Sequence, residues 1–158
     1  MMYYTQMQSP VGKLLLTADG KALAGIYFED EQVPSEDDWE SRPGHPVLKA
    51  AGRQLEEYFA GERKVFDLLL APKGTVFQRR VWKALERIPY GKTQSYGEIA
   101  RKIKNPKAVR AVGAANGANP IPIVVPCHRV IGADGTLTGY GGGLPRKQKL
   151  LALEGYRG

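Results

Sequence analysis

In the first half of the chain, short apolar runs alternate with polar, acidic stretches. Two apolar runs, in residues 13–17 and 22–28, are separated by Asp19-Gly20, a dipeptide typical of tight hairpin turns. They predict two antiparallel strands. The acidic stretch that follows, residues 29–44, predicts irregular structure.

Apolar residues with helical spacing come next and end at Gly61, which predicts a helix with one buried face. That face consists of Val47, Leu48, Ala51, Leu55, Tyr58 and Phe59. Residues 64–70, KVFDLLL, predict another strand, and residues 68–75 predict a linker. We therefore expect a small sheet packed on one helix, with no cluster of reactive side chains.

Two capping boxes predict where helices begin in the second half. Thr75 and Gln78 stand three residues apart ahead of an apolar stripe, and Ser95 and Glu98 repeat the arrangement. The stripe consists of Phe77, Val81, Leu85 and Ile88.

Asn105 and Pro106 predict the cap and first turn of a third helix, which runs to Gly117 and forms a helix-turn-helix with the preceding one. This helix is mostly Ala, Val and Gly, so few side chains could read base edges in a major groove. It suits close, shape-based approach to the minor groove, with Arg110 able to enter the base stack. An Ala-rich helix packed inside a helical subdomain fits the same pattern.

Two segments beyond this helix flank the single cysteine. Residues 119–126, NPIPIVVP, are too rich in proline for a helix and predict a buried extended segment leading to Cys127. Residues 130–140 predict a hairpin that turns at Asp134-Gly135, a candidate wing.

Positive charge is concentrated in the second half. The net charge is +7, but residues 1–75 carry 8 Lys/Arg against 12 Asp/Glu, whereas residues 76–158 carry 15 against 4. Such a field favours a polyanionic partner, nucleic acid first, although a basic surface that only aids solubility fits as well.

Composition is that of a folded intracellular protein. The 158 residues are 42% hydrophobic and 25% charged, enough to bury a core in one domain or two small ones. One cysteine cannot form an intramolecular disulfide, and the sequence lacks both an apolar run long enough to cross a membrane and the pattern of a signal peptide. We expect a cytoplasmic protein.

Cys127 stands beside His128, a pairing that suggests nucleophilic chemistry. A thiol reacts as thiolate, histidine is the usual base, and a carboxylate usually orients the histidine. Neighbours in an extended segment point to opposite faces, so contact would need a bend or a bridging water. The candidate carboxylates are Glu86, Glu98, Asp134 and Glu154. Glu154, at the end of a last helix predicted over residues 145–154, follows a glycine-rich loop that could fold it back; a cysteine that only packs is the alternative.

Metal or cofactor binding finds no support in the sequence. With one cysteine and two histidines, His45 and His128, no zinc-ligand spacing is present. We expect His45 at the surface, before a helix.

Residues 75–155 closely resemble the O6-alkylguanine-DNA alkyltransferases (methylated-DNA–protein-cysteine methyltransferases). The match rests on PCHRV at residues 126–130 within NPIPIVVPCHRVIGADGTLTGYGGGLP, and on SYGEIA and RAVGAANGANP before it. The first half matches only in general layout. The resemblance implies an α/β (α+β) protein: a ribonuclease H-like sheet-plus-helix domain, residues 1–72, then a winged helix-turn-helix-like domain, residues 73–158, that carries the active site.

The resemblance also implies a reaction. Cys127 would take the alkyl group from O6 of a damaged guanine, or less readily O4 of thymine, irreversibly, so that one molecule repairs one lesion. His128 would act as base on Cys127 through water, and Glu154 would hold His128. Because a base inside the duplex hides its O6, the nucleotide must be flipped out.

Contacts to DNA and to the flipped base are implied as well. Tyr96 matches the tyrosine that hydrogen-bonds guanine N3 and helps the base leave, a chemically sensible role because negative charge develops there. Arg110 matches the arginine finger that fills the gap, and Asn119 the asparagine that braces the turn before the active-site segment.

The rest of the implied base pocket lies around the cysteine. The carbonyls of Cys127 and Val130 would accept the guanine amine, and Tyr140 and its loop would close over the base. Some relatives have serine where this chain has Gly141, so a contact to O6 there would come from the backbone N–H. Lys147 matches a family lysine of less certain role; a phosphate contact or a solvated charge is the simpler reading of it.

Two other classes of function remain as alternatives. A winged-helix regulator, or a lesion-recognising relative without activity, would not need Cys127, and a cysteine hydrolase would need an acyl pocket and an oxyanion hole. We expect a monomer that binds alkylated double-stranded DNA through the minor groove, largely independent of sequence, with cooperative assembly on DNA left open.

Overall fold

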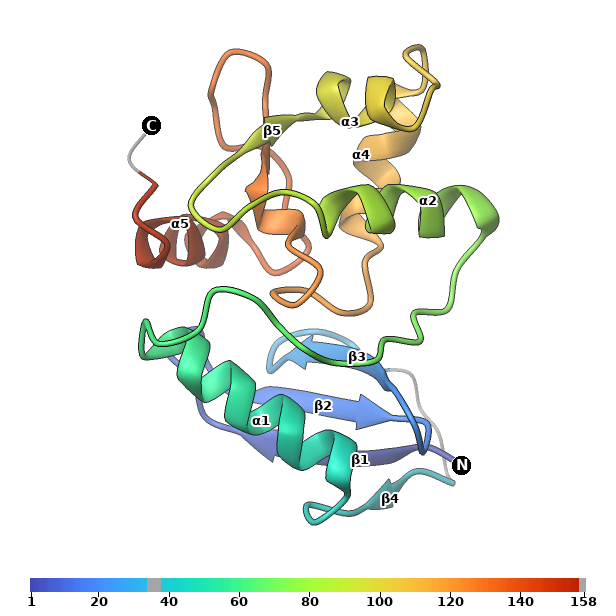
Figure 1. Cartoon of the computed structure of the whole chain (residues 1–158), viewed down its shortest axis with the longest axis vertical. Coiled ribbons are helices and arrows are strands. Elements are labelled where there is room, and N and C mark those ends of the chain that lie inside the picture. The colour runs from blue at the N-terminus through green and yellow to red at the C-terminus, as the bar shows by residue number, and fades with distance from the viewer. Residues whose placement is uncertain (34–37, 157–158) are drawn as a thin grey trace. The chain divides into compact units, whose positions relative to one another are not determined.

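The structure is a computed structural model that describes residues 1–33 and 38–156. The chain divides into two compact units, Met1–Lys73 and Gly74–Gly158 (Figure 1). Among the described residues, no helix has the length and apolarity needed to cross a membrane.

The first unit is a sheet with one helix across it (Figure 1). Its strands are β1 (Tyr3–Met7), β2 (Leu14–Ala18), β3 (Leu23–Phe28) and β4 (Glu40–Ser41), in the order β3-β2-β1-β4. The predicted hairpin is confirmed: β2 and β3 pair antiparallel, and Gly20 adopts the positive φ of 114° that the turn requires. Strand β1, which was not predicted, pairs antiparallel with β2.

The predicted helix is confirmed as α1 (Pro46–Phe59), which ends before Gly61 with its φ of 77°. It buries Leu48, Ala51, Leu55 and Tyr58. The surface position expected for His45 is wrong, because this ring is 8% exposed, stacks on Tyr3 at 5.0 Å and caps α1 by accepting from the Val47 amide. The cap explains its burial.

Two predictions for this unit are wrong: that the acidic stretch is irregular, and that residues 64–70 form a strand. The acidic stretch contains β4, which pairs parallel with β1; its residues 34–37 lie outside the described residues. Residues 64–70 do not form a strand beyond one bridge from Leu70 to Leu23. The reason is a side chain: the Gln54 amide donates to the Asp67 carbonyl at 3.0 Å and accepts from the Asp67 amide at 2.8 Å, taking the place of a neighbouring strand.

The second unit is mainly helical. Its elements are α2 (Val76–Leu85), β5 (Gln94–Ser95), α3 (Tyr96–Lys102), α4 (Val109–Gly117), the 3-10 turn η1 (Cys127–Arg129), β6 (Val130–Ile131) and α5 (Leu144–Leu153). Both capping boxes are confirmed, with Thr75 accepting from Gln78 and Ser95 from Glu98 while each partner's side chain bonds back. Local chemistry therefore sets where α2 and α3 begin.

The third predicted helix starts later than expected. Asn105 does not cap it: its carbonyl closes a turn with the Ala108 amide, and α4 begins at Val109 without a side-chain cap. One face of α4 buries Val112, Ala115 and Asn116, and Trp82 of α2 donates to the Ala115 carbonyl at 2.8 Å. The opposite face, with Arg110, is exposed, so the helix both packs inside the unit and presents small residues outward.

In the segment 119–126, residues 121–126 are buried as predicted, but the chain is not extended. They turn on themselves, and Ile123 has a φ of 74°, a strained conformation for a branched side chain. The predicted hairpin wing is also wrong beyond its turn: the chain turns at Gly132–Thr136, but β6 pairs in parallel with β5 instead of with a following strand.

Candidate active site

Three segments of the second unit bring polar side chains together: η1, the end of α5 and the loop after α2. Cys127 opens η1, which is tightened by the bond from the Arg129 amide to the Pro126 carbonyl at 3.0 Å. The chain is therefore bent at Cys127, although no hydrogen bond joins the Cys127 and His128 side chains among the described residues. Cys127 is 4% exposed and His128 is fully buried.

The Cys127 thiol is protonated at rest. Burial raises the pKa of the Cys127 thiol to about 11, while hydrogen bonds from Asn119 and Tyr140 and the positive charge of Lys147 act in the opposite direction. At neutral pH the sulfur therefore needs a base before it can act as a nucleophile.

His128 provides such a base. Its Nε2 lies 2.7 Å from Glu154 Oε2, and both side chains are fully buried. A carboxylate only accepts, so Nε2 carries the proton and Nδ1 keeps its lone pair. Nδ1 is buried and makes no hydrogen bond among the described residues. Burial lowers the pKa of His128, the hydrogen bond and charge of Glu154 raise it, and Arg129 and Lys147 lower it further.

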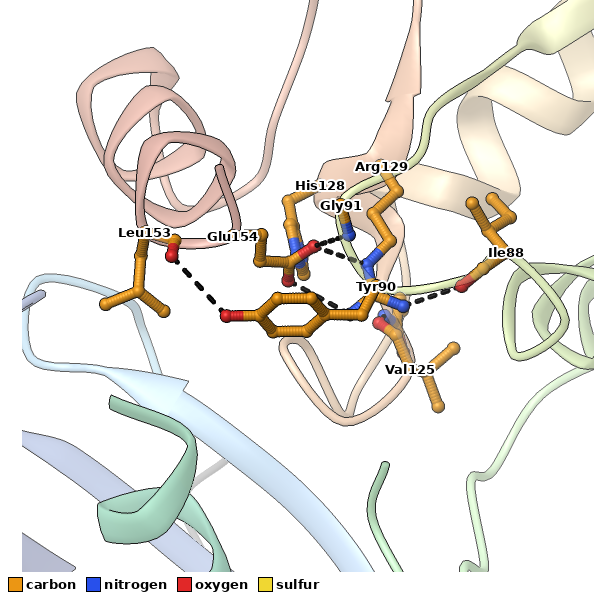
Figure 2. A network of polar contacts seen from close by, with 9 residues as sticks. Ile88, Tyr90, Gly91, Val125, His128, Arg129, Leu153 and Glu154 are labelled. Carbon is orange, nitrogen blue, oxygen red and sulfur yellow. Dashed lines mark hydrogen bonds and ion pairs between the residues drawn. The ribbon is translucent and has the colours of Figure 1, made fainter. Parts of the chain in front are cut away.

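Arg129 completes the network, as Figure 2 shows. Its Nε and Nη2 donate to the two Glu154 oxygens at 2.8 and 3.0 Å, and Nη1 donates to the Ile88 carbonyl at 2.6 Å. The Gly91 amide also donates to Glu154, at 3.1 Å. The guanidinium lies 5.8 Å from the Tyr90 ring centre.

Lys147 is not the solvated charge or phosphate contact that its sequence context favoured. It is fully buried on α5, and its Nζ donates to the carbonyls of Val130 at 2.5 Å and Thr138 at 2.7 Å. Burial lowers the pKa of Lys147 to about 8, and Cys127 acts to raise it. Lys147 therefore places a positive charge inside the site and not at the protein surface.

Two asparagines hold the backbone on either side of the cysteine. Asn119 donates to the Val125 carbonyl at 2.8 Å and accepts from the Ile121 amide at 3.0 Å, which braces the strained turn at Ile123. Asn116 of α4 donates to the Cys127 carbonyl at 3.3 Å. The helix that carries Arg110 is thus bonded to the backbone of Cys127.

The other expected base contacts lie around the loop before α5. The Tyr96 hydroxyl lies 3.4 Å from the Thr138 carbonyl and 3.2 Å from its hydroxyl, and the Tyr96 ring lies beside Gly113. A side chain at Gly141 would come within 3.2 Å of the Gly117 carbonyl. Tyr140 is among the groups that lower the pKa of the Cys127 thiol. Arg110 lies apart from these residues, exposed in the first turn of α4.

Arg129, Tyr90 and Asn116 were not predicted as site residues. For Arg129 a signal was present, because an arginine beside a buried Cys-His pair needs a buried acid, and the second half has only four acids. Tyr90 and Asn116 contribute through contacts that only the fold creates, so their sequence positions gave no signal.

Family models describe both parts of the chain. Residues 76–156 match the model of the 6-O-methylguanine DNA methyltransferase DNA binding domain, and residues 2–72 match that of the ribonuclease-like domain of the same enzymes. Fold and site thus define a two-domain methyltransferase with its cysteine in the DNA-binding part. The chain belongs to the 6-O-methylguanine DNA methyltransferase family.

Individual relatives match over nearly the whole chain. The methylated-DNA–protein-cysteine methyltransferase of Methanosarcina acetivorans is 54% identical, covering 98% of this chain and 99% of its own length. The crystal structure of the Mycobacterium tuberculosis O6-methylguanine methyltransferase is 54% identical, with a TM-score of 0.91 over 98% of this chain and 93% of that one. A structure of the M. tuberculosis protein in complex with DNA gives 53% identity and a TM-score of 0.90 over 96% and 92%. The expected family and the mixed α/β fold are confirmed.

Proposed function

We propose that this protein repairs DNA by moving the alkyl group of O6-alkylguanine onto its own Cys127, once per molecule. The observation that carries the proposal is a buried, protonated thiol whose next residue in the chain is a histidine that keeps a lone pair free and is held by a buried carboxylate. The sulfur becomes a nucleophile when the thiol loses its proton, and the free lone pair of the histidine can accept that proton.

In the proposed reaction, His128 Nδ1 takes the thiol proton, directly or through a bridging water. The sulfur then forms a bond to the alkyl carbon as the bond from that carbon to O6 breaks, and the electron pair leaves with the guanine. Tyr96 donates a proton at N3, so the guanine departs neutral. Solvent later returns a proton from His128 to Tyr96. A thioether does not hydrolyse back to a thiol, so the protein is consumed.

The second unit would bind the duplex through α4. Its exposed face of small residues permits close approach, and the placement of Arg110 in the first turn supports a role in filling the space of a flipped nucleotide. The basic second half favours double-stranded DNA of any sequence as partner. O4-alkylthymine is a second, slower substrate in this proposal, and a monomer is the acting unit.

The flipped base would lie against the loop that precedes α5. Tyr140 and the Gly141 backbone N–H would cover it, and the carbonyls of Cys127 and Val130 would accept its amine. The Val130 carbonyl accepts from Lys147, and the Cys127 carbonyl accepts from both Asn116 and the Val130 amide. Because a carbonyl oxygen has two lone pairs, the guanine amine would share or replace one of the two bonds at Cys127. Asn119 and Lys147 would position this backbone.

The proposed assignment also covers organisation and location. Residues 73–158 would form the DNA-binding and acceptor domain and residues 1–72 the ribonuclease H-like one, supported by the division of the chain into two compact units. A cytoplasmic location follows for a prokaryotic protein whose substrate is chromosomal DNA.

Intact mass spectrometry tests the proposal directly. After incubation with excess duplex containing O6-methylguanine, we expect a gain of about 14 Da, mapped to Cys127 and not increasing with time. Cys127→Ser should gain no mass yet still bind the duplex. An unchanged mass in the wild type, or demethylation of several duplexes per molecule, would contradict single transfer to Cys127.

A further inference from the structure

Both oxygens of the Glu154 carboxylate accept two hydrogen bonds each. Oε1 accepts from the Gly91 amide at 3.1 Å and Arg129 Nε at 2.8 Å, and Oε2 accepts from His128 Nε2 at 2.7 Å and Arg129 Nη2 at 3.0 Å (Figure 2). The paired contact from Arg129 fixes the orientation of the carboxylate and compensates its charge. The carboxylate that orients His128 therefore already has a permanent positive partner.

The charges that act on His128 come from two elements. Glu154 and Lys147 belong to α5 and its cap, and Arg129 follows His128 on η1. If His128 were protonated, three positive groups would face a single negative one. The His128 and Glu154 side chains are fully buried, so water screens these charges little. A neutral imidazole is the favoured state of this cluster.

We propose that Arg129 is a positioning residue that keeps His128 neutral at neutral pH and thereby sets the lower pH limit of alkyl transfer. The proposal rests on the function proposed above, in which His128 must begin with a free lone pair on Nδ1. Without Arg129, the uncompensated charge of Glu154 would hold a proton on His128, and an imidazolium cannot accept the thiol proton.

Arg129 is held in place independently of Glu154. It donates to the Ile88 carbonyl at 2.6 Å, and its guanidinium lies 5.8 Å from the centre of the Tyr90 ring. A lysine at this position could keep the positive charge but not the paired contact to both carboxylate oxygens. Arg129→Lys and Arg129→Met therefore separate loss of geometry from loss of charge.

The first test is the pH dependence of the single-turnover rate of methyl transfer. In Arg129→Met, we expect the midpoint of the acidic limb to rise by about one pH unit or more, because a like charge has been removed from beside His128. The rate should approach that of the wild type in alkaline buffer. Arg129→Lys should shift less, and Arg53→Met, which removes an exposed arginine of α1, should not shift the profile. A rate lowered by the same factor at every pH would overturn the proposal.

The second test does not depend on activity. The chain has only two histidines, so NMR can follow His128 with His45 as internal reference. We expect His128 to titrate at higher pH in Arg129→Met and at lower pH in Glu154→Gln than in the wild type. Should Arg129→Met not fold, Arg129→Lys and Glu154→Gln carry the comparison. Equal His128 midpoints in all folded variants would overturn the role of Arg129, whereas a wild type that titrates as expected but transfers no methyl group would overturn only the proposed function.

Discussion

At the scale of single residues, burial and the charge of Lys147 both affect how easily the Cys127 thiol loses its proton. Burial raises the pKa of Cys127 to about 11 and lowers that of Lys147 to about 8, and each charge would stabilise the other. Between these two values a neutral lysine faces a neutral thiol, whereas at neutral pH the ammonium is present and favours the thiolate.

Removing this ammonium should make the thiol less acidic. For Lys147→Met we expect the pH profile of Cys127 carbamidomethylation to change at and below pH 7, where the ammonium is present, with a rate there about tenfold lower, the equivalent of one pKa unit. Alkylation of the single cysteine can be measured by intact mass. The matched control is Lys149→Met, an exposed lysine of the same helix. Profiles that coincide for both variants would contradict the coupling.

At the scale of elements, α4 connects the exposed Arg110 to the backbone of Cys127. Arg110 lies exposed in its first turn, and Asn116 near its end donates to the Cys127 carbonyl. A substitution at Arg110 could therefore affect either DNA binding or the reaction at Cys127. Comparing a duplex substrate with a free base separates the two effects.

Arg110→Ala should slow repair of duplex DNA far more than reaction with a free O6-alkylguanine base. In the proposed role, the Arg110 side chain is needed only where a flipped nucleotide leaves a gap, so its loss should slow the duplex reaction about ten- to a hundredfold, the equivalent of a few kcal/mol of unstacking. Single-turnover rates on both substrates provide the measurement, with Lys107→Ala, an exposed residue before α4, as control. An equal loss on both substrates would argue against the finger role.

The elements that the sequence predicts are those specified by neighbouring residues. The capping boxes at Thr75 and Ser95 and the glycines at residues 20 and 61 act within a few positions, and these features are found as predicted. The failures involve distant partners: Gln54 replaces a strand beside residues 64–70, and β6 pairs with β5 from another part of the chain. Local pattern does not contain such contacts.

The same distinction applies to the site. Cys127, His128 and Glu154 were predicted from motif chemistry and resemblance, and the structure brings His128 and Glu154 into contact. The paired bond of Arg129 to Glu154 and the burial of Lys147 were missed, since each depends on how α5 packs against η1. Charged residues are usually solvated, and that general rule misleads inside an active site.

At the scale of the whole molecule, the two halves of the sequence carry net charges of opposite sign. Residues 76–158 carry a charge of 15 − 4 = +11 and residues 1–75 a charge of 8 − 12 = −4. Two of the positive residues of the second half, Arg129 and Lys147, are buried, so the remaining ones form the field that an approaching duplex meets. Attraction of this kind acts on the phosphate backbone and is blind to base sequence.

Binding to undamaged duplex should therefore depend steeply on salt and hardly on sequence. We expect affinity to fall by about tenfold or more between 50 and 200 mM salt, because counterions are released from each neutralised phosphate. Fluorescence anisotropy with two duplexes of equal length and unrelated sequence provides the measurement. A clear preference for one sequence at every salt concentration would favour a sequence-reading regulator instead.

The high pKa of the Cys127 thiol has a consequence for the lifetime of the protein. A protein that is consumed in one reaction, as proposed above, must survive until it meets its substrate, and thiolates are the form that oxidants and other electrophiles attack. A thiol that is 4% exposed and has a pKa of about 11 is shielded from both while it waits. In the proposed reaction, the thiol would therefore stay unreactive until His128 takes its proton.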